Sequence, residues 1–262
     1  RYQYPLSVFV ISRLGLAFLV YLSLVMVPMN TDLGVSVGQA FPGNLFLDGW
    51  SRWDAGWYRQ IAEHGYSDQP LNDQGQRNVV FFPLYPMTIR LLNTLSGNSH
   101  VSGILISNLA FVVALVSLHQ LVRSRYDTRV ARRTVLLLST SPFSFYFSAV
   151  YTESLFLMLA VLAFCFGEHE RWGLAVAMAA AASATRTVGV TVAFGLGLLY
   201  LEKAGFRLRE IRWDALWLMV APSGLVAYVA FLWYRFDAPL LFIRSRYVPG
   251  WGGAGLGIES AW

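Results

Sequence analysis

The chain has 262 residues, of which 56% are hydrophobic and only 13% are charged. Soluble domains are about 45–50% apolar and about 25% charged, so this composition excludes an ordinary soluble domain and indicates a protein with several membrane-spanning helices. A formal net charge of +5 is also found in proteins that bind nucleic acid, but here the arginines fall mostly between apolar segments, which is typical of membrane topology. We therefore expect membrane lipids, and no nucleic acid, among the partners.

Seven apolar segments are candidates for crossing a bilayer, which takes about 20 residues of helix. The first is too long for the core of a signal peptide and is expected to stay in the protein. Several others are short, and the two segments between residues 172 and 201 could instead form one broken or tilted pair. The predicted spans are 6–28, 101–122, 134–150, 154–168, 172–186, 188–201 and 214–236. We expect 1–262 to form a single all-α transmembrane domain.

Two basic stretches predict the orientation of these spans. Residues 123–133 carry five arginines and one acid, and residues 202–213 carry four basic and two acidic residues. Short basic loops remain in the cytoplasm, and four predicted spans separate these two. The loop 29–100 then lies outside; its first part, 29–80, holds three arginines and six acids. The same outer face is expected to hold the turns at 150–154 and 185–188 and the stretch 237–262.

The outer loop is predicted to contain helices that lie along the membrane interface. Residues 81–95 include two prolines and Arg90, and a full span there would move the basic stretch 123–133 outside. We therefore expect a re-entrant or interfacial helix over 81–95. Within 50–66, Trp57 and Tyr58 follow Asp54 at helical spacing, which indicates a second interfacial helix with an aromatic face.

A glycine-rich stretch, 250–257, lies near the end of the chain, after the last predicted span. This looks like a loop cut short, so we expect the chain to be C-terminally incomplete.

Three ionisable residues on the predicted outer face are functional candidates, because charge near the bilayer is costly. Asp54 begins the helix over 50–66, where capping that helix is the alternative role. Glu153 lies in a tight turn between two spans and could likewise be a cap. Arg186 interrupts a nearly uncharged run and could simply reach to the interface. A buried arginine would need an anion, and a lipid phosphate fits its forked donors.

Four motifs in order along residues 10–190 give the sequence a family resemblance. The first is 52–58 (RWDAGWY) with 61–66 (IAEHGY), and the second is 81–86 (FFPLYP). The third is 141–144 (SPFS) with 148–154 (SAVYTES), and the fourth is 184–189 (ATRTVG). Together they resemble the PIG-V-type mannosyltransferases, the family of GPI mannosyltransferase II and its bacterial relatives.

The resemblance implies a GT-C-type fold, a multi-span glycosyltransferase with its site on the extracytoplasmic face. It also implies a polyprenyl-phosphate sugar donor, usually mannose, and inversion at the anomeric carbon. In this family an acidic residue of the first outer loop is the base, which here corresponds to Asp54. Glu153 and Arg186 match further motif positions.

The resulting hypothesis is glycosyl transfer with Asp54 and Glu153 as catalytic residues. Arg186 and Arg52 would bind the donor phosphate, and the aromatic side chains of this region would stack on sugar or lipid. These substrate-binding candidates are Trp53, Trp57, Tyr58 and Tyr151. The acceptor could be a glycan, a glycolipid or a protein hydroxyl. One arginine can balance much of the charge on a leaving phosphate monoester, so the chemistry does not require a divalent metal, although it does not exclude one. We predict no cofactor.

Two other classes of protein fit an outer aromatic vestibule. A transporter or flippase of lipid-linked glycans would be expected to show repeated halves and polar residues at mid-membrane depth, and no internal repeat is visible. A non-catalytic scaffold subunit would use the helix over 50–66 as a docking surface and would tolerate loss of both carboxylates.

Overall fold

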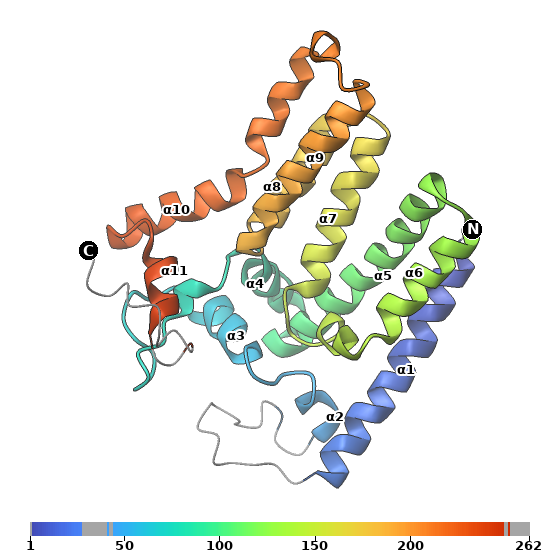
Figure 1. Ribbon diagram of the computed structural model, residues 1–262. Coiled ribbons are helices and arrows are strands. Elements are labelled where there is room, and N and C mark those ends of the chain that lie inside the picture. Colours follow the sequence, from blue (N-terminus) through green and yellow to red (C-terminus); the bar gives the residue numbers. More distant parts are fainter. Residues whose placement is uncertain (1, 28–40, 42–43, 249–250, 252–262) are drawn as a thin grey trace.

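The computed structural model describes residues 2–27, 41, 44–248 and 251, and within these ranges the secondary structure is entirely helical (Figure 1). Two of the described helices are long and apolar enough to cross a membrane, namely α1 (Gln3–Met26) and α5 (Ser99–Arg125). A third candidate is a pair of helices, Trp213–Val220 and α10 (Ser223–Phe236), which meet at a 43° bend. The all-α expectation is confirmed for this part of the chain, but seven full-length spans are not.

The predicted span 134–150 is wrong in its boundaries. Asp127 accepts a hydrogen bond from the Val130 amide at 2.7 Å, which caps α6 and starts it at Thr128. Helix α6 (Thr128–Thr140) ends before Pro142, whose ring cannot continue it, and a 3-10 helix over Pro142–Phe147 follows. The basic stretch 123–133 is therefore mostly helical rather than a loop.

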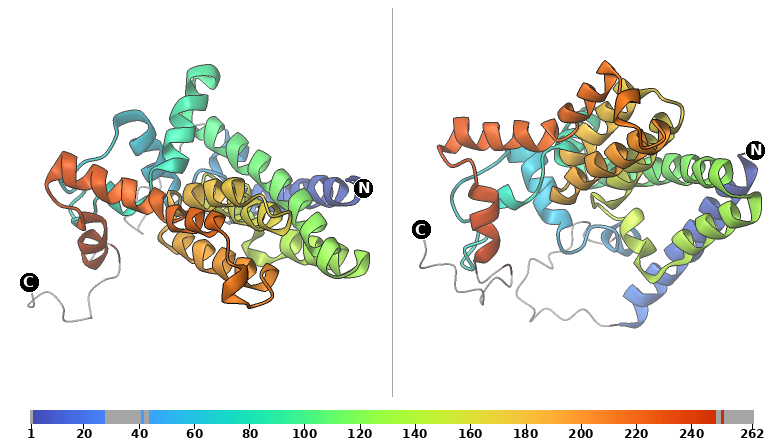
Figure 2. Two further views of the ribbon diagram at one scale, coloured as in Figure 1. Left: turned by 90° about the horizontal axis from the view of Figure 1, so that it is seen from above. Right: turned by 45° about the horizontal axis from the view of Figure 1, so that its top comes forward.

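The remaining spans are shorter than the bilayer requires for an upright helix. Helix α7 (Glu153–Glu168) has 16 residues, α8 (Trp172–Ser183) has 12, and α9 (Val190–Lys203) has 14. A tight 3-10 turn over Thr187–Gly189 joins the last two. Helix α7 packs between α5 and α8 (Figures 1 and 2), and α7, α8 and α9 carry much of the largest buried core.

The helices predicted within the outer loop are present. Helix α3 (Ala55–His64) and α4 (Leu84–Ser96) pack on each other and on α5, and a short helix α2 (Leu45–Asp48) precedes them. Helix α4 buries Tyr85 and Ile89 and leaves Leu91 73% exposed, the two-faced pattern expected of a helix at an interface. The predicted loop residues 29–40 and 42–43 lie outside the described residues.

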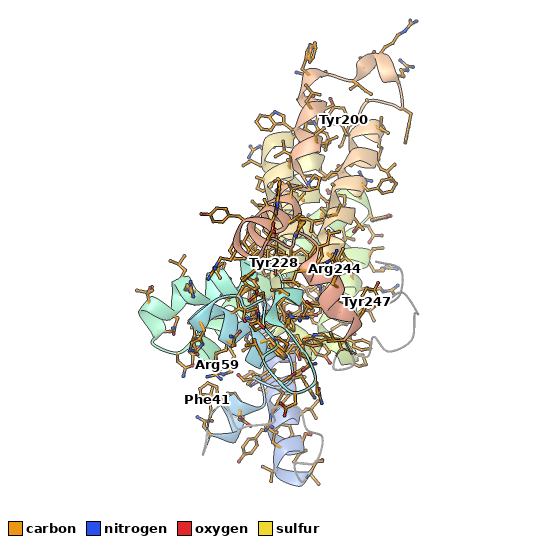
Figure 3. The ribbon with its side chains drawn as sticks, turned by 90° about the vertical axis from the view of Figure 1, so that its left-hand side faces the viewer. Phe41, Arg59, Tyr200, Tyr228, Arg244 and Tyr247 are labelled. Atoms are coloured by element: carbon orange, nitrogen blue, oxygen red, sulfur yellow. The ribbon has the colours of Figure 1, made fainter. Side chains whose placement is uncertain are left out.

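The two ends of the helical bundle differ in their chemistry. At one end the two basic stretches meet, since Arg125 forms an ion pair with Glu202 at 3.0 Å and Lys203 pairs with Glu168 at 2.9 Å. Figure 3 shows Tyr200 of α9 near this end and Arg59 of α3 near the other. The turns that follow Ser148 and Ala184 lie at the end that carries α3 and α4, as their predicted common face requires.

The C-terminal segment returns to this second end. Helix α10 diverges from the bundle, and α11 (Leu241–Arg244) then packs beside the 3-10 helix over Asn78–Val80 (Figures 1 and 2). Phe242 of α11 contacts Phe82 with a ring-centroid distance of 5.6 Å. The predicted incomplete loop over 250–257 lies outside the described residues, except for Trp251.

Arg13 joins α1 to the turn that precedes α7. Its buried guanidinium donates to the carbonyl of Ser139 at 2.9 Å, to the carbonyl of Ser144 at 2.8 Å, and to the hydroxyl of Ser148 at 3.1 Å.

We expect Arg13→Met to lower the free energy of unfolding by about 1–3 kcal/mol, because these buried acceptors lose their donor. Thermal unfolding in mild detergent checks this, with the exposed neighbour Leu14→Met as control; equal stability of both variants would contradict it.

Candidate active site

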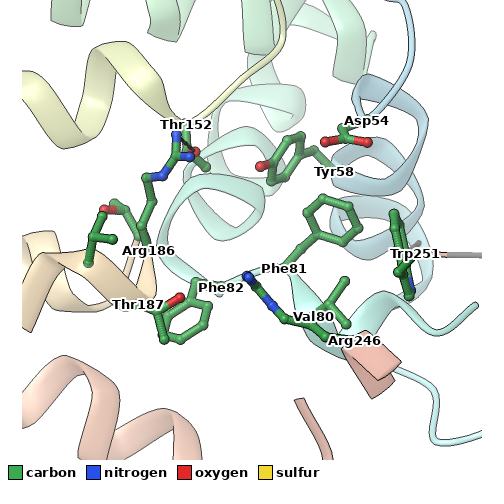
Figure 4. A pocket seen from close by; sticks show the side chains of 12 residues that line it. Asp54, Tyr58, Val80, Phe81, Phe82, Thr152, Arg186, Thr187, Arg246 and Trp251 are labelled. Carbon is green, nitrogen blue, oxygen red and sulfur yellow. Dashed lines mark hydrogen bonds between the residues drawn. The ribbon is translucent and has the colours of Figure 1, made fainter. Parts of the chain in front are cut away.

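A pocket of about 340 Å³ lies where α3, the start of α4 and the turns before α7 and after α8 converge. Two backbone hydrogen bonds join these segments: the Leu84 amide donates to the Ala184 carbonyl and the Val150 amide to the Trp50 carbonyl, both at 3.0 Å. Figure 4 shows the side chains that line the pocket. They are Asp54, Tyr58, Val80, Phe81, Phe82, Thr152, Thr185, Arg186, Thr187, Val188, Arg246 and Trp251.

Asp54 occupies the N-cap position of α3, but its carboxylate makes no capping hydrogen bond. The capping alternative therefore does not account for this side chain, which lines the pocket instead. Burial raises the pKa of Asp54, and the nearby charge of Glu153 raises it further, while Arg186 acts in the opposite direction. A carboxylate whose pKa is moved toward neutrality is a stronger base, as general base catalysis requires.

The segment that precedes Asp54 is held in an unusual conformation. Trp53 has a φ of 51°, in the left-handed region that non-glycine residues seldom adopt. The Tyr151 hydroxyl accepts a hydrogen bond from the Asp54 amide at 3.2 Å and donates to the Arg52 carbonyl at 3.3 Å, so it spans the strained residue. Tyr151 thus fixes the start of α3 and does not itself line the pocket.

Arg186 and Glu153 form an ion pair between the turn after α8 and the first residue of α7. The same guanidinium nitrogen of Arg186 lies 3.4 Å from the Thr152 hydroxyl. Because Arg186 is 38% exposed, solvent screens this pair, and its main effect is to orient the guanidinium. Thr152 makes no capping hydrogen bond, and the second carboxylate oxygen of Glu153, Oε2, is buried without a hydrogen-bond partner in the described residues.

The predicted aromatic residues occupy different positions around the pocket. Tyr58 is buried and lines it, and this burial raises the pKa of its phenol. Trp57 stacks against Phe81 with centroids 6.0 Å apart and contacts Trp251 at 5.4 Å, so it supports the wall from behind. Trp53 is 59% exposed and outside the lining.

Arg52 does not line the pocket. It forms an ion pair with Asp48, the last residue of α2, one helical turn earlier in the sequence. The predicted role of Arg52 in binding phosphate therefore has no support from its position, whereas Asp54, Tyr58 and Arg186 share one cavity.

Three lining residues lie outside the motifs and the predicted site residues: Val80, Arg246 and Trp251. The sequence did contain a signal for Arg246. Basic residues are less common in outer loops than in cytoplasmic ones, so an arginine in the outer stretch 237–262 is as unusual as Arg186 is in its turn.

Within the described ranges, no group of three or more His, Cys, Asp or Glu side chains is arranged to hold a metal ion.

Gly189 allows the tight turn that positions Arg186. A β-carbon at this residue would lie 2.2 Å from the Ala182 carbonyl oxygen, so the backbone would have to shift. We expect Gly189→Ala to destabilise the protein by about 1–3 kcal/mol and to displace Arg186. The control is Gly197→Ala in α9, where nothing lies within 4 Å and alanine favours the helix. Thermal unfolding of both variants in detergent is the measurement, and an unaffected Gly189→Ala protein would contradict the expectation.

The chain has relatives among known proteins. Relatives include GPI alpha-1,6-mannosyltransferase 2 of Rattus norvegicus, 35% identical over 136 residues, and that of Mus musculus, 38% identical over 136 residues. The Homo sapiens protein of this name is 32% identical over 136 residues. Each match covers 48% of this chain and only 26% of the relative, so the chain aligns with about a quarter of their length. No solved structure matches.

A family model described as mannosyltransferase (PIG-V) matches residues 9–201. This range includes Asp54 and Arg186, which line the pocket, and Glu153, which pairs with Arg186 but does not line the pocket. The chain therefore belongs to the PIG-V mannosyltransferase family.

Proposed function

We propose that the protein is an inverting mannosyltransferase that takes its sugar from a polyprenyl-phosphate donor on the extracytoplasmic face of the cell membrane. The observation that carries this proposal is the meeting of a half-buried carboxylate, Asp54, with the cation of Arg186 in one pocket of a PIG-V family chain. A base and an anion-binding group within one cavity are what glycosyl transfer from a lipid phosphate needs.

In the proposed step, the oxygen of an acceptor hydroxyl attacks the anomeric carbon as Asp54 accepts its proton. The bond from the anomeric carbon to the phosphate oxygen breaks, and polyprenyl phosphate leaves with that electron pair. Attack from the face opposite the leaving group inverts the anomeric centre. General base catalysis contributes about 10²- to 10⁴-fold. Arg186 stabilises the charge that grows on the phosphate, so the proposed step needs no divalent metal.

Glu153 has two roles in this proposal. One carboxylate oxygen forms the ion pair that orients Arg186, although Glu153 itself does not line the pocket. Its charge also raises the pKa of Asp54. The aromatic wall of Tyr58, Phe81 and Trp251 provides faces on which a sugar ring can stack.

The surrounding fold is proposed to be of the multi-span GT-C type. Helices α1 and α5 and the bent α10 pair would cross the bilayer, the shorter helices α7, α8 and α9 would complete the bundle, and α3 and α4 would lie at the outer interface. The acceptor, a glycan, glycolipid or protein that carries a free hydroxyl, would approach the pocket from this side.

Transfer of label from a lipid-phosphate sugar tests the proposal. Membranes that carry the protein are incubated with labelled polyprenyl-phosphate mannose and a crude extract of acceptors, beside membranes without it. We expect protein-dependent loss of label from the lipid donor, and no use of GDP-mannose supplied after donor synthesis is blocked. Transfer from a different lipid-phosphate sugar would change the proposed identity of the sugar and leave the proposed reaction intact. Unchanged donor that crosses the bilayer of vesicles would favour a transporter, and neither transfer nor crossing would favour a scaffold.

A further inference from the structure

Arg246 enters the pocket from a part of the chain far from the family motifs. It lies in the 3-10 helix Ser245–Tyr247, directly after α11 and beyond residues 9–201. Figure 4 shows its guanidinium reaching into the same space as the side chains of Arg186 and Asp54. Two arginines from different elements therefore face one cavity.

Packing around Arg246 fixes the segment that carries it. Phe242, four residues earlier, contacts Phe82 at 5.6 Å and Tyr228 at 6.0 Å between ring centroids. The Tyr228 hydroxyl donates to the Val79 carbonyl at 2.7 Å, and Ser245 is fully buried. Figure 3 shows Arg244 and Tyr247 on this segment beside α10. The backbone at Arg246 is thus tied to residues 79–82, and 80–82 line the pocket.

The two arginines that line the pocket differ in whether they form an ion pair. Arg186 is paired with Glu153, whereas no acid among the described residues forms an ion pair with Arg246. With Asp54 ionised, the two arginines and the two carboxylates cancel. Loss of Arg246 would leave a net negative pocket, which would repel an anionic donor. An arginine that faces a cavity without an acidic partner is suited to an anionic ligand, and phosphate oxygens match its forked donors.

We propose that Arg246 and Arg186 together bind the phosphate of the lipid-linked donor, with Arg246 supplying the charge that Glu153 does not offset. This inference rests on the proposed function and extends it to a residue outside the family motifs. A phosphodiester donor carries about one negative charge, and the leaving monoester carries about 1.5 to 2. Arg246 therefore contacts a group whose charge grows during transfer, and it stabilises the transition state more than the bound donor.

Direct binding of polyprenyl monophosphate tests the inference without requiring turnover. The protein in nanodiscs of uncharged lipid is titrated with this ligand, with the uncharged polyprenol as reference. We expect Arg246→Gln to weaken phosphate binding by about 10- to 100-fold and Arg246→Lys to weaken it less. The matched control is Arg244→Gln, since Arg244 is also exposed on the same segment but does not line the pocket. Thermal unfolding confirms that each variant is folded.

Three results would overturn the inference, and a fourth separates it from the proposed function. Equal weakening by Arg246→Gln and Arg244→Gln would mean that the segment acts only through its general charge. Equal, Arg246-dependent binding of phosphatidic acid would identify a phospholipid headgroup site instead of a donor site. Donor turnover by Arg246→Gln with unchanged kcat and KM would reject Arg246 while leaving the proposed function intact. Arg246-dependent binding of polyprenyl phosphate by a protein that transfers no sugar would instead support the site and reject the proposed function.

Discussion

Asp54→Asn is expected to reduce sugar transfer by about 10²- to 10⁴-fold in a protein that remains folded. The amide has the shape of the carboxylate but cannot accept the acceptor's proton. Since the Asp54 side chain makes no capping hydrogen bond, the substitution removes no contact that stabilises α3. Donor consumption in membranes, normalised to the amount of protein present, gives the comparison.

The matched control for this variant is Asp73→Asn. Asp73 is an exposed acid of the same loop and does not line the pocket. It should retain wild-type transfer, which shows that the loss in Asp54→Asn comes from the pocket. Undiminished transfer by a folded Asp54→Asn protein would remove Asp54 from the role of base.

The same base predicts how transfer depends on pH. Asp54 must be ionised to accept a proton, so the rate should fall as pH falls through its pKa. Burial and the charge of Glu153 raise that pKa, so the decline should begin above the range of an ordinary aspartate, whose pKa is about 3.9.

Arg186→Gln is expected to lower the rate of transfer by about 10²- to 10³-fold, and added donor should not restore it. The lost charge acts on the leaving phosphate, where charge develops only as the bond breaks, so kcat falls as well as kcat/KM. Arg186 also lowers the pKa of Asp54, and its removal should therefore move the acidic decline in rate to higher pH. A purely structural role for Arg186 would leave the position of that decline unchanged.

Two further variants separate charge from geometry at this position. Arg186→Lys keeps the charge but loses the planar, forked arrangement of guanidinium hydrogen-bond donors. This variant should therefore have intermediate activity. Arg171→Gln removes an exposed arginine at the opposite end of α8 and should behave as wild type. If saturating donor fully rescued Arg186→Gln, Arg186 would contribute to donor binding alone.

The sequence determined the class of the protein and the presence of its local elements. Apolar composition indicated helices in a membrane, and helical spacing after Asp54 predicted α3. Prolines and Arg90 argued against a span over 81–95, where α4 is found. Element boundaries were less predictable because caps decide them: Asp127 starts α6 inside a basic stretch that reads as a loop, and Pro142 ends it.

The sequence also identified Asp54, Glu153 and Arg186 as candidates, because charge beside a bilayer is costly wherever it lies. The sequence could not decide whether the Asp54 side chain caps α3 or faces a cavity, since a residue at the N-cap position can do either. Tertiary structure decided this, and it paired Arg186 with Glu153 and Arg52 with Asp48. It also brought Arg246 to the pocket through contacts of Phe242 with Phe82 and Tyr228, which are distant in sequence. Such contacts depend on how whole helices pack, and no local pattern of residues encodes them.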